Sequence, residues 1–307
     1  MTQILEDIIA RVPLWAGAQD LSYQPLGGGI TNKNYRVDVD SQSYVLRIAG
    51  VKTELLGIDR QNEYIANSAA GKLGIAPEVV YYIQPEGYLV THFLTAGPLP
   101  PDELRLPANL RKVAELLKNI HGMADIPGEF IVFRVVEDYA RVARGYDVQF
   151  PDNYDWLLEQ MYAAEQAFQS DALPLRPCHN DLLNENFLKE GEHIYILDWE
   201  YAGMGDIYFD LANLSVNHGF TDDEDHMLLE AYFGELSAVN WARLKVMKIL
   251  SDFRESMWGM VQIGISDLDF DFRAYADKHF DRMTKNIKDD RWEKWLATIR
   301  NPSLANR

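Results

Sequence analysis

The sequence predicts an α+β protein with two lobes, a small β-rich lobe over residues 1–94 and a larger α-rich lobe over residues 95–307. Three observations support this prediction. Residues 1–94 show the apolar/polar alternation that is typical of antiparallel strands, interrupted by helical spacing. The stretch TAGPLPPDELRLP (95–107) is rich in Pro and Gly, which is typical of a boundary between lobes. Beyond it, apolar residues recur mainly at helical spacing.

The first lobe is expected to begin with a short helix over residues 4–12. Strands are expected over YQPLGGGITNKNYRVDV (23–39) and SYVLRIAG (43–50), and two more over EVVYYIQPEGYLVTHFL (78–94), around a QPEG turn. The stretch DRQNEYIANSAAGKL (59–73) has helical spacing. Four of its residues can share one face of a helix: Tyr64, Ile65, Ser68 and Ala69.

The second lobe is expected to be mainly helical. The stretch ANLRKVAELLKNIHGM (108–123) carries apolar residues at helical spacing along one face, and DNYDWLLEQMYAAEQAFQ (152–169) carries a similar stripe. A short strand is expected within HIYILDWE (193–200). Four further helices are expected over residues 223–235, 238–263, 270–287 and 290–299.

Composition excludes several classes of protein. The net charge of −18 repels nucleic-acid phosphates, so we expect no nucleic-acid partner. The single cysteine, Cys178, excludes an intrachain disulfide, and its acidic surroundings favour packing over a nucleophilic role. The start, MTQILEDIIARVPLW, lacks the basic and apolar regions of a signal peptide, and no apolar run approaches the ~20 residues of a membrane span. We therefore expect a cytoplasmic protein.

A dense polar stretch, CHNDLLNENF (178–187), lies shortly before the apolar run IYIL of the expected strand. Asp198 ends this strand, and a carboxylate there is costly unless it is paired or binds a cation. Asn186 and Asp198 offer the hard oxygen ligands that suit Mg²⁺. Asp181, five residues before Asn186, would face the same cavity and could accept a proton from a hydroxyl group.

The first lobe offers residues for phosphate binding. The glycine turn LGGGITNKNYRV would let backbone amides approach phosphates, and the candidate residues in it are Gly28, Gly29, Thr31 and Asn32. Arg47, in YVLRIAG, could pair with Glu63 on the next helix and be fixed toward phosphate oxygens. A plain hairpin and a surface ion pair are the alternative interpretations of these two features.

The order of Asp181, Asn186 and Asp198 matches the catalytic Asp, metal-binding Asn and metal-binding Asp of protein kinases, with HND in place of HRD and DWE in place of DFG. The sequence resembles the choline/ethanolamine kinase family, within the aminoglycoside-phosphotransferase-like group of small-molecule kinases. The motifs that carry the resemblance are GGGITNKNYRV, YVLRI, HNDLLNENFL, LDWEYAGMGDIYFDLAN and WGMVQIGISDLDFDFRAYA, spread over residues 27–276. The resemblance implies a protein-kinase-like fold.

The resemblance also implies roles for individual residues. Asp181 would be the catalytic base, and Asn186 and Asp198 would hold Mg²⁺. Arg47 and Glu63 would form the nucleotide clamp. The adenine would lie near THFL (91–94), where His92 and Leu94 are the candidates. Two residues would be structural: His179 as part of the catalytic loop, and Asp210 as a hydrogen-bonded brace of that loop.

A cationic acceptor would be recognised by aromatic faces and carboxylates. The candidate residues are Trp258, Tyr275, Tyr201, Glu200 and Glu255. A role in the core is the alternative for the aromatic residues. Two positions depart from eukaryotic members of the family: Glu255 stands where they carry a second tryptophan, and Leu183 where they carry a polar residue.

The resulting hypothesis is an enzyme that uses ATP and Mg²⁺ to phosphorylate the hydroxyl of a small cationic amino alcohol, with choline as the leading candidate. A kinase for ethanolamine, thiamine, an aminoglycoside or a sugar is an alternative, because the shared motifs serve ATP and metal rather than the acceptor. A catalytically inactive nucleotide-binding regulator is a further alternative. A homodimer is compatible with the resemblance, but the sequence does not fix the oligomeric state.

Overall fold

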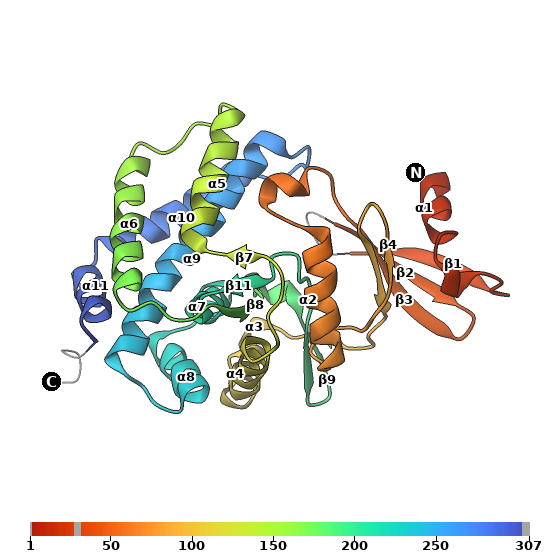
Figure 1. Ribbon diagram of the computed structural model, residues 1–307, viewed down its shortest axis with the longest axis horizontal. Coiled ribbons are helices and arrows are strands. Elements are labelled where there is room, and N and C mark those ends of the chain that lie inside the picture. Colours follow the sequence, from red (N-terminus) through yellow and green to blue (C-terminus); the bar gives the residue numbers. More distant parts are fainter. Residues whose placement is uncertain (1, 28–31, 303–307) are drawn as a thin grey trace. The chain divides into compact units, whose positions relative to one another are not determined.

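The structure, a computed structural model, describes residues 2–27 and 32–302 and divides into two compact units (Figure 1). Unit 1 comprises Met1–Glu54, Ile58–Leu99 and Glu185–Glu200. Unit 2 comprises Leu55–Gly57, Pro100–Asn184 and Tyr201–Arg307. The first unit thus extends past residue 94 and includes a later segment with two of the candidate metal ligands. The boundary of functional lobes after residue 94 stays a prediction.

Unit 1 is built on a five-stranded antiparallel sheet with the strand order β1-β2-β3-β5-β4. Its strands are β1 (Leu21–Leu26), β2 (Lys33–Val39), β3 (Gln42–Ile48), β4 (Val79–Ile83) and β5 (Tyr88–His92). Alternate residues of β2 and β3 point to one face, where they form a core with the helix α1 (Thr2–Ile9) and the 3₁₀ turn Pro13–Trp15. The core thereby fixes the register of β3, the strand that carries Arg47.

The helix α2 (Arg60–Lys72) begins at Asp59, whose side chain accepts hydrogen bonds from the amides of Gln61 and Asn62. The helix expected here is present, but the face that it buries is not the one shared by Tyr64, Ile65, Ser68 and Ala69. The buried residues are Glu63, Ala66, Asn67 and Ala70, whereas Ile65 is exposed. Polar contacts select this face: Glu63 pairs with arginines, and the Asn67 amide donates to the backbone oxygen of Pro77.

A second, three-stranded sheet of unit 1 has the order β10-β9-β6. Its strands are β6 (Gly97–Pro98), β9 (Phe187–Glu190) and β10 (His193–Ile196). The hairpin β9–β10 pairs Phe187 with Ile196, so the residues on either side of this pair, Asn186 and Leu197, lie at the same end of the hairpin.

Unit 2 is mainly helical. Its helices are α3 (Pro101–Leu104), α4 (Pro107–His121), α5 (Val132–Gly145), α6 (Tyr154–Ser170), α7 (Ile207–Asn217), α8 (Asp222–Phe233), α9 (Ala238–Ile265), α10 (Phe272–Ile287) and α11 (Trp292–Arg300). The long helix α9 packs against α5, α7, α10 and α11 (Figure 1). A helix enclosed in this way is buried along nearly its whole length, so any charged residue on it needs a partner inside the protein.

A small sheet of unit 2 holds β7 (Glu129–Phe130), β11 (Gly203–Gly205) and β8 (Arg176–Cys178) in the order β7-β11-β8. Strand β8 leads directly into the HND motif. Packing is tight at Gly205, because a Cβ atom on it would lie 3.2 Å from the backbone oxygen of Phe130 and 3.3 Å from Oδ1 of Asn180, so a larger residue would need these neighbours to shift. Close packing of β11 thus fixes where the motif begins.

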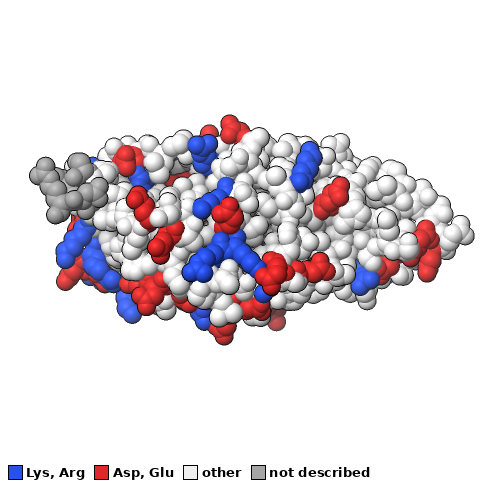
Figure 2. Space-filling view, turned by 90° about the horizontal axis from the view of Figure 1, so that it is seen from below, with Lys and Arg blue, Asp and Glu red and all other residues white. Residues whose placement is uncertain are grey.

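The α+β organisation expected from the sequence is confirmed, with a β-rich unit 1 and an α-rich unit 2. On the face that Figure 2 displays, basic side chains are interspersed with acidic ones rather than gathered into a continuous basic surface. No helix in residues 2–27 and 32–302 is both long and apolar enough to span a membrane.

Candidate active site

The loop that carries Asp181 is held by one carboxylate of helix α7. Asp210 is fully buried, and its two oxygens accept hydrogen bonds from successive backbone amides, that of His179 at 2.8 Å and that of Asn180 at 2.7 Å. Burial raises the pKa of Asp210, but hydrogen bonding and the charge of His121 and His179 hold it below its usual value. Asp210 is therefore an ionised acceptor fixed beneath the loop.

A second residue of α7 continues this support. Asn213, one turn after Asp210, accepts a hydrogen bond from the amide of Leu182 at 2.6 Å and donates to the Ser251 hydroxyl on α9. The amide between these contacts, that of Asp181, donates to Nδ1 of His179. All four amides from His179 to Leu182 therefore have an acceptor, and the backbone of the predicted base is fixed on both sides.

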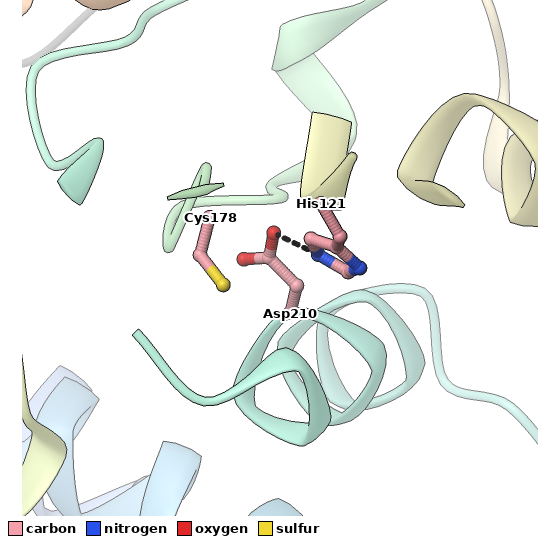
Figure 3. A group of neighbouring side chains, drawn as sticks. All are labelled: His121, Cys178 and Asp210. Atoms are coloured by element: carbon pink, nitrogen blue, oxygen red, sulfur yellow. Dashed lines mark hydrogen bonds and ion pairs between the residues drawn. The ribbon is translucent and has the colours of Figure 1, made fainter. Parts of the chain in front are cut away.

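Figure 3 shows His121, Cys178 and Asp210 converging from α4, β8 and α7, with one ligand atom from each within 4.8 Å of the others. This set of residue types can bind metal, but each partner is already engaged. His121 lies 3.1 Å from Asp210 through Nε2 and 2.6 Å from the Tyr232 hydroxyl through Nδ1. Burial, aided by Asp210 and Asp206, raises the pKa of the Cys178 thiol well above its usual range. In this cluster the thiol is protonated, and His121 and Asp210 are held by hydrogen bonds within the protein. We assign no metal to it.

Asp181 shares an arginine with Glu255. Nη1 of Arg254, on α9, lies 3.3 Å from Oδ1 of Asp181 and 2.7 Å from Oε1 of Glu255. All three residues are buried. Burial opposes the charge on Glu255, yet Arg254 and the Tyr275 hydroxyl hold its pKa below the usual value. The predicted base and the predicted acceptor-binding carboxylate are thus joined by one guanidinium.

Three predicted aromatic residues surround this group. The Tyr275 hydroxyl donates to Oε2 of Glu255 at 2.7 Å, and the Tyr275 ring lies edge-on to Trp258, with centroids 5.5 Å apart. The ring of Tyr201 faces Arg254, whose guanidinium carbon lies 4.3 Å from the ring centroid. The residues Asp181, Glu255, Trp258, Tyr275 and Tyr201 therefore belong to one cluster of unit 2.

The two predicted metal ligands lie together in unit 1. The amide of Leu197 donates to the backbone oxygen of Asn186 at 2.8 Å, which sets Asp198 next to Asn186 at the end of the β9–β10 hairpin. Asp198 adopts a left-handed backbone conformation, with φ of 64°. Asp tolerates this region better than most residues, and such conformations concentrate at functional sites.

Asp198 belongs to a network in which three carboxylates share two arginines. Arg47 contacts Glu63 at 3.0 Å, Asp198 at 2.6 Å and Glu200 at 2.9 Å. Arg60 contacts Glu63 at 2.7 Å and Glu200 at 3.1 Å. One negative charge is therefore in excess, which fits a bound cation.

The pKa values of Asp198 and Glu200 depend on burial and on the charges of this network. Burial raises the pKa of Asp198 to about 6, with Arg47 opposing the rise and Glu200 and Glu63 adding to it. Burial likewise acts on Glu200, but Arg47 and Arg60 hold its pKa below the usual value. Glu200, predicted to bind the acceptor, thus lies among arginines of unit 1 and accepts a further hydrogen bond from Asn32 at 2.9 Å. Its role toward an acceptor stays a prediction.

Five other predicted nucleotide residues are less constrained by the structure. Gly28, Gly29 and Thr31 lie outside the described residues. His92 ends β5 and stacks on Tyr44, with ring centroids 5.4 Å apart, and the half-buried Leu94 follows it. Their contact with adenine stays a prediction.

Sequence reasoning missed two arginines. Arg60 opens α2, three residues before Glu63, and this i,i+3 spacing could have indicated the pair. Arg254 stands in the stretch SDFRESMWGM of α9, and a charge in a helix that is buried all round signals an internal partner. The sequence does not say that this partner is Asp181, 73 residues away.

A family model described as the phosphotransferase enzyme family matches residues 22–246. The protein LicA of Haemophilus influenzae is 25% identical over 273 residues, which cover 85% of this chain and 79% of that protein. Ethanolamine kinase 1 of Mus musculus is 26% identical over 316 residues, which cover 89% of this chain and 85% of that protein.

Solved structures agree with these relatives. A choline/ethanolamine kinase family protein from Mesorhizobium loti is 32% identical with a TM-score of 0.84, covering 97% of this chain and 99% of that one. LicA in complex with AMP is 25% identical with a TM-score of 0.74, covering 97% and 98%. An aminoglycoside phosphotransferase, 18% identical with a TM-score of 0.66 and coverage of 93% and 99%, shares the protein-kinase-like fold.

Proposed function

Because the chain belongs to the phosphotransferase enzyme family, and within it to the choline/ethanolamine kinases, we propose that this small-molecule kinase phosphorylates a small cationic amino alcohol, with choline as the leading candidate. The donor in this proposal is ATP. The observation that carries the proposal is the cluster in which Asp181 lies with a buried carboxylate, Glu255, and with the rings of Trp258 and Tyr275. Aromatic faces and carboxylates are the groups that recognise an ammonium ion.

Asp181 is the proposed catalytic base. Its carboxylate accepts the proton of the acceptor hydroxyl as the oxygen forms a bond to the γ-phosphorus and the bond from that phosphorus to the bridging oxygen of ADP breaks. The hydrogen bonds to the amides of residues 179–182 keep this carboxylate in place. Most of the rate enhancement in such a transfer comes from positioning and electrostatics, and fixed backbone supports both.

Arg47 is the proposed phosphate-binding residue, since its guanidinium can hold phosphate oxygens bidentately and Glu63 orients it. Asn186 and Asp198 would hold Mg²⁺, and their amide and carboxylate oxygens are the donor types that this ion prefers. The excess carboxylate of the Arg47–Arg60 network supports this assignment. When bound, the ion would offset the charge of the phosphates.

The test is an ATP-consumption assay with choline, ethanolamine, thiamine, an aminoglycoside and a hexose as acceptors, with mass spectrometry of the product. We expect phosphorylation of an amino alcohol that depends on Mg²⁺ and is slowed by about 10²–10⁴-fold in Asp181→Asn. Turnover of only the aminoglycoside or the hexose would show that the acceptor is misassigned. Full turnover by Asp181→Asn would contradict the assignment of the base.

A further inference from the structure

Arg254 is a buried cation that the proposed reaction does not use. Its side chain is 2% exposed, and it lies on α9 among the acceptor-binding residues. Burial lowers the pKa of an arginine, but Glu255 and Asp181 hold that of Arg254 well above its usual value, so it is charged. Burying a charged arginine is costly, so its contacts in this position indicate what role it has.

Arg254 makes the contacts that a cationic head group would make. Its guanidinium carbon lies 4.3 Å from the centroid of Tyr201, the distance of a cation–π contact. Its Nη1 also meets one oxygen of Glu255 and one oxygen of Asp181. One aromatic face and part of each carboxylate are therefore occupied from within the chain.

Glu255 can still bind a cationic acceptor. It shares the guanidinium of Arg254 with Asp181, so the cluster holds two carboxylates for this one arginine. Glu255 accepts one hydrogen bond at each oxygen, from Arg254 at 2.7 Å and from the Tyr275 hydroxyl at 2.7 Å. A carboxylate oxygen can accept two, so further N–H donors can still be bound.

The guanidinium itself is incompletely paired. Nε and Nη2 of Arg254 are buried and have no hydrogen-bond partner among the described residues. Unsatisfied buried donors are costly and point to a ligand or water that meets them. The hydroxyl oxygen of an alcohol can satisfy such a donor, whereas neither an ammonium N–H nor an N-methyl group can.

We propose that Arg254 determines acceptor specificity: by covering Tyr201 and engaging both carboxylates, it makes the site select a primary ammonium over a quaternary one. A primary ammonium supplies N–H donors to the remaining lone pairs of Glu255. A quaternary ammonium has no N–H and depends on aromatic faces, of which Arg254 has taken one. This inference rests on the proposed function, a kinase for a small cationic amino alcohol, and replaces choline, the candidate that the resemblance favours, with an ethanolamine-like alcohol as the preferred acceptor.

The experiment compares kcat/KM for ethanolamine, its N-methyl and N,N-dimethyl derivatives, and choline, at saturating ATP. For the unaltered protein we expect kcat/KM to fall along this series, by tenfold or more from first to last. The four acceptors differ only in the number of N–H donors and methyl groups, so the series needs no variant to be informative.

Variants of Arg254 then test whether this residue sets the preference between ethanolamine and choline. Arg254→Met frees the face of Tyr201, and we expect the ratio of ethanolamine to choline turnover to fall by tenfold or more. Arg254→Lys retains a charge near both carboxylates and should keep the original order. Arg243→Met is the matched control, because Arg243 is also a 2% exposed arginine of α9 but pairs with Asp171 at 2.9 Å, so the order should not change.

Two results would overturn the proposal about Arg254 without contradicting the proposed amino alcohol kinase activity. One is that choline is the best acceptor of the unaltered protein, and the other is that folded Arg254→Met keeps the same order of kcat/KM for the four alcohols. Thermal unfolding identifies variants that fail to fold, and in that case the series with the unaltered protein decides. If none of the four alcohols is phosphorylated, both the proposed function and the role of Arg254 in specificity are contradicted.

Discussion

Asp210 and Asn213 lie one turn apart on α7 and together accept hydrogen bonds from three backbone amides of the loop that carries Asp181. A helix is a rigid support, and the i,i+3 spacing puts both acceptors on the same side of it. The loop is thus positioned by side chains that need not touch a substrate.

This relationship predicts a large effect of Asp210→Asn. The amide nitrogen of asparagine cannot accept, so at least one of the amides of His179 and Asn180 would lose its partner in a buried site. We expect the free energy of unfolding to fall by about 2 kcal/mol or more, and kcat to fall with it. Urea denaturation followed by circular dichroism measures the first effect.

Asp206→Asn is the matched control on the same helix. Asp206 is the N-cap of α7 and accepts from the amide of Tyr208 at 2.9 Å, a role that asparagine fulfils equally well. We expect a change in the free energy of unfolding of less than about 0.5 kcal/mol. Equal losses in the two variants would mean that Asp210 does not brace the loop.

Asp181→Asn is predicted to lower kcat by about 10²–10⁴-fold, because general-base catalysis contributes a factor of this size. Nucleotide affinity should be unchanged, because the proposed phosphate-binding residues belong to unit 1. Steady-state kinetics and fluorescence titration with a nucleotide analogue measure the two effects. Asp138→Asn, an exposed change on α5, is the control and should leave kcat unaltered.

Arg47→Lys is predicted to raise KM for ATP by about tenfold, since lysine keeps the charge but loses the planar fork that holds two oxygens. The KM for the acceptor should change little. Arg36→Lys on the neighbouring strand β2 is the control, because Arg36 pairs with Asp38 on its own strand. The assignment of Arg47 fails if both variants keep the KM of the unaltered protein.

Cys178 is predicted to be unreactive in the folded protein. Its raised pKa keeps it a thiol, and it is fully buried, so a thiol reagent at pH 8 should label it only after denaturation. It is the sole cysteine, so the labelling stoichiometry is unambiguous.

The same pKa shift predicts a pH dependence of stability. The unfolded thiol ionises near pH 9 while the folded one does not, so the unfolded state binds fewer protons above this pH, and the free energy of unfolding falls as pH rises. Cys178→Ala removes this titration, and its free energy of unfolding should fall less between pH 8 and pH 10. Parallel pH dependences of the two proteins would contradict the shift.

The sequence predicts most helices of unit 2, namely α4, α6 and α8–α11, but not α3, α5 and α7. Helix α5 is not among the expected helices, although its buried residues lie along one face. Helix α7 is different, because it is buried from Tyr208 to Ser215 and therefore shows no polar face. Its polar residues, Asp210 and Asn213, face the loop rather than solvent.

The candidate site likewise contains one ion pair that the sequence indicates and one that it does not. The pair of Arg47 and Glu63 follows from charges on successive elements, and the structure contains it. The pair of Arg254 and Asp181 joins residues 73 positions apart, and no local pattern says which carboxylate a buried arginine will meet. Such pairs are set by the packing of α9 against its neighbours, which depends on the whole fold.

The division of the chain into two units has a consequence for how such enzymes could diversify. The short segment Glu185–Glu200 brings both proposed metal ligands into unit 1, whereas Tyr201 and the remaining acceptor-side residues belong to unit 2. Under the proposed assignments, the residues that bind the phosphate donor and those that recognise the alcohol lie in separate, interleaved blocks of sequence. Substitutions confined to α9 and α10 would then change the choice of alcohol while the donor-binding residues stay the same.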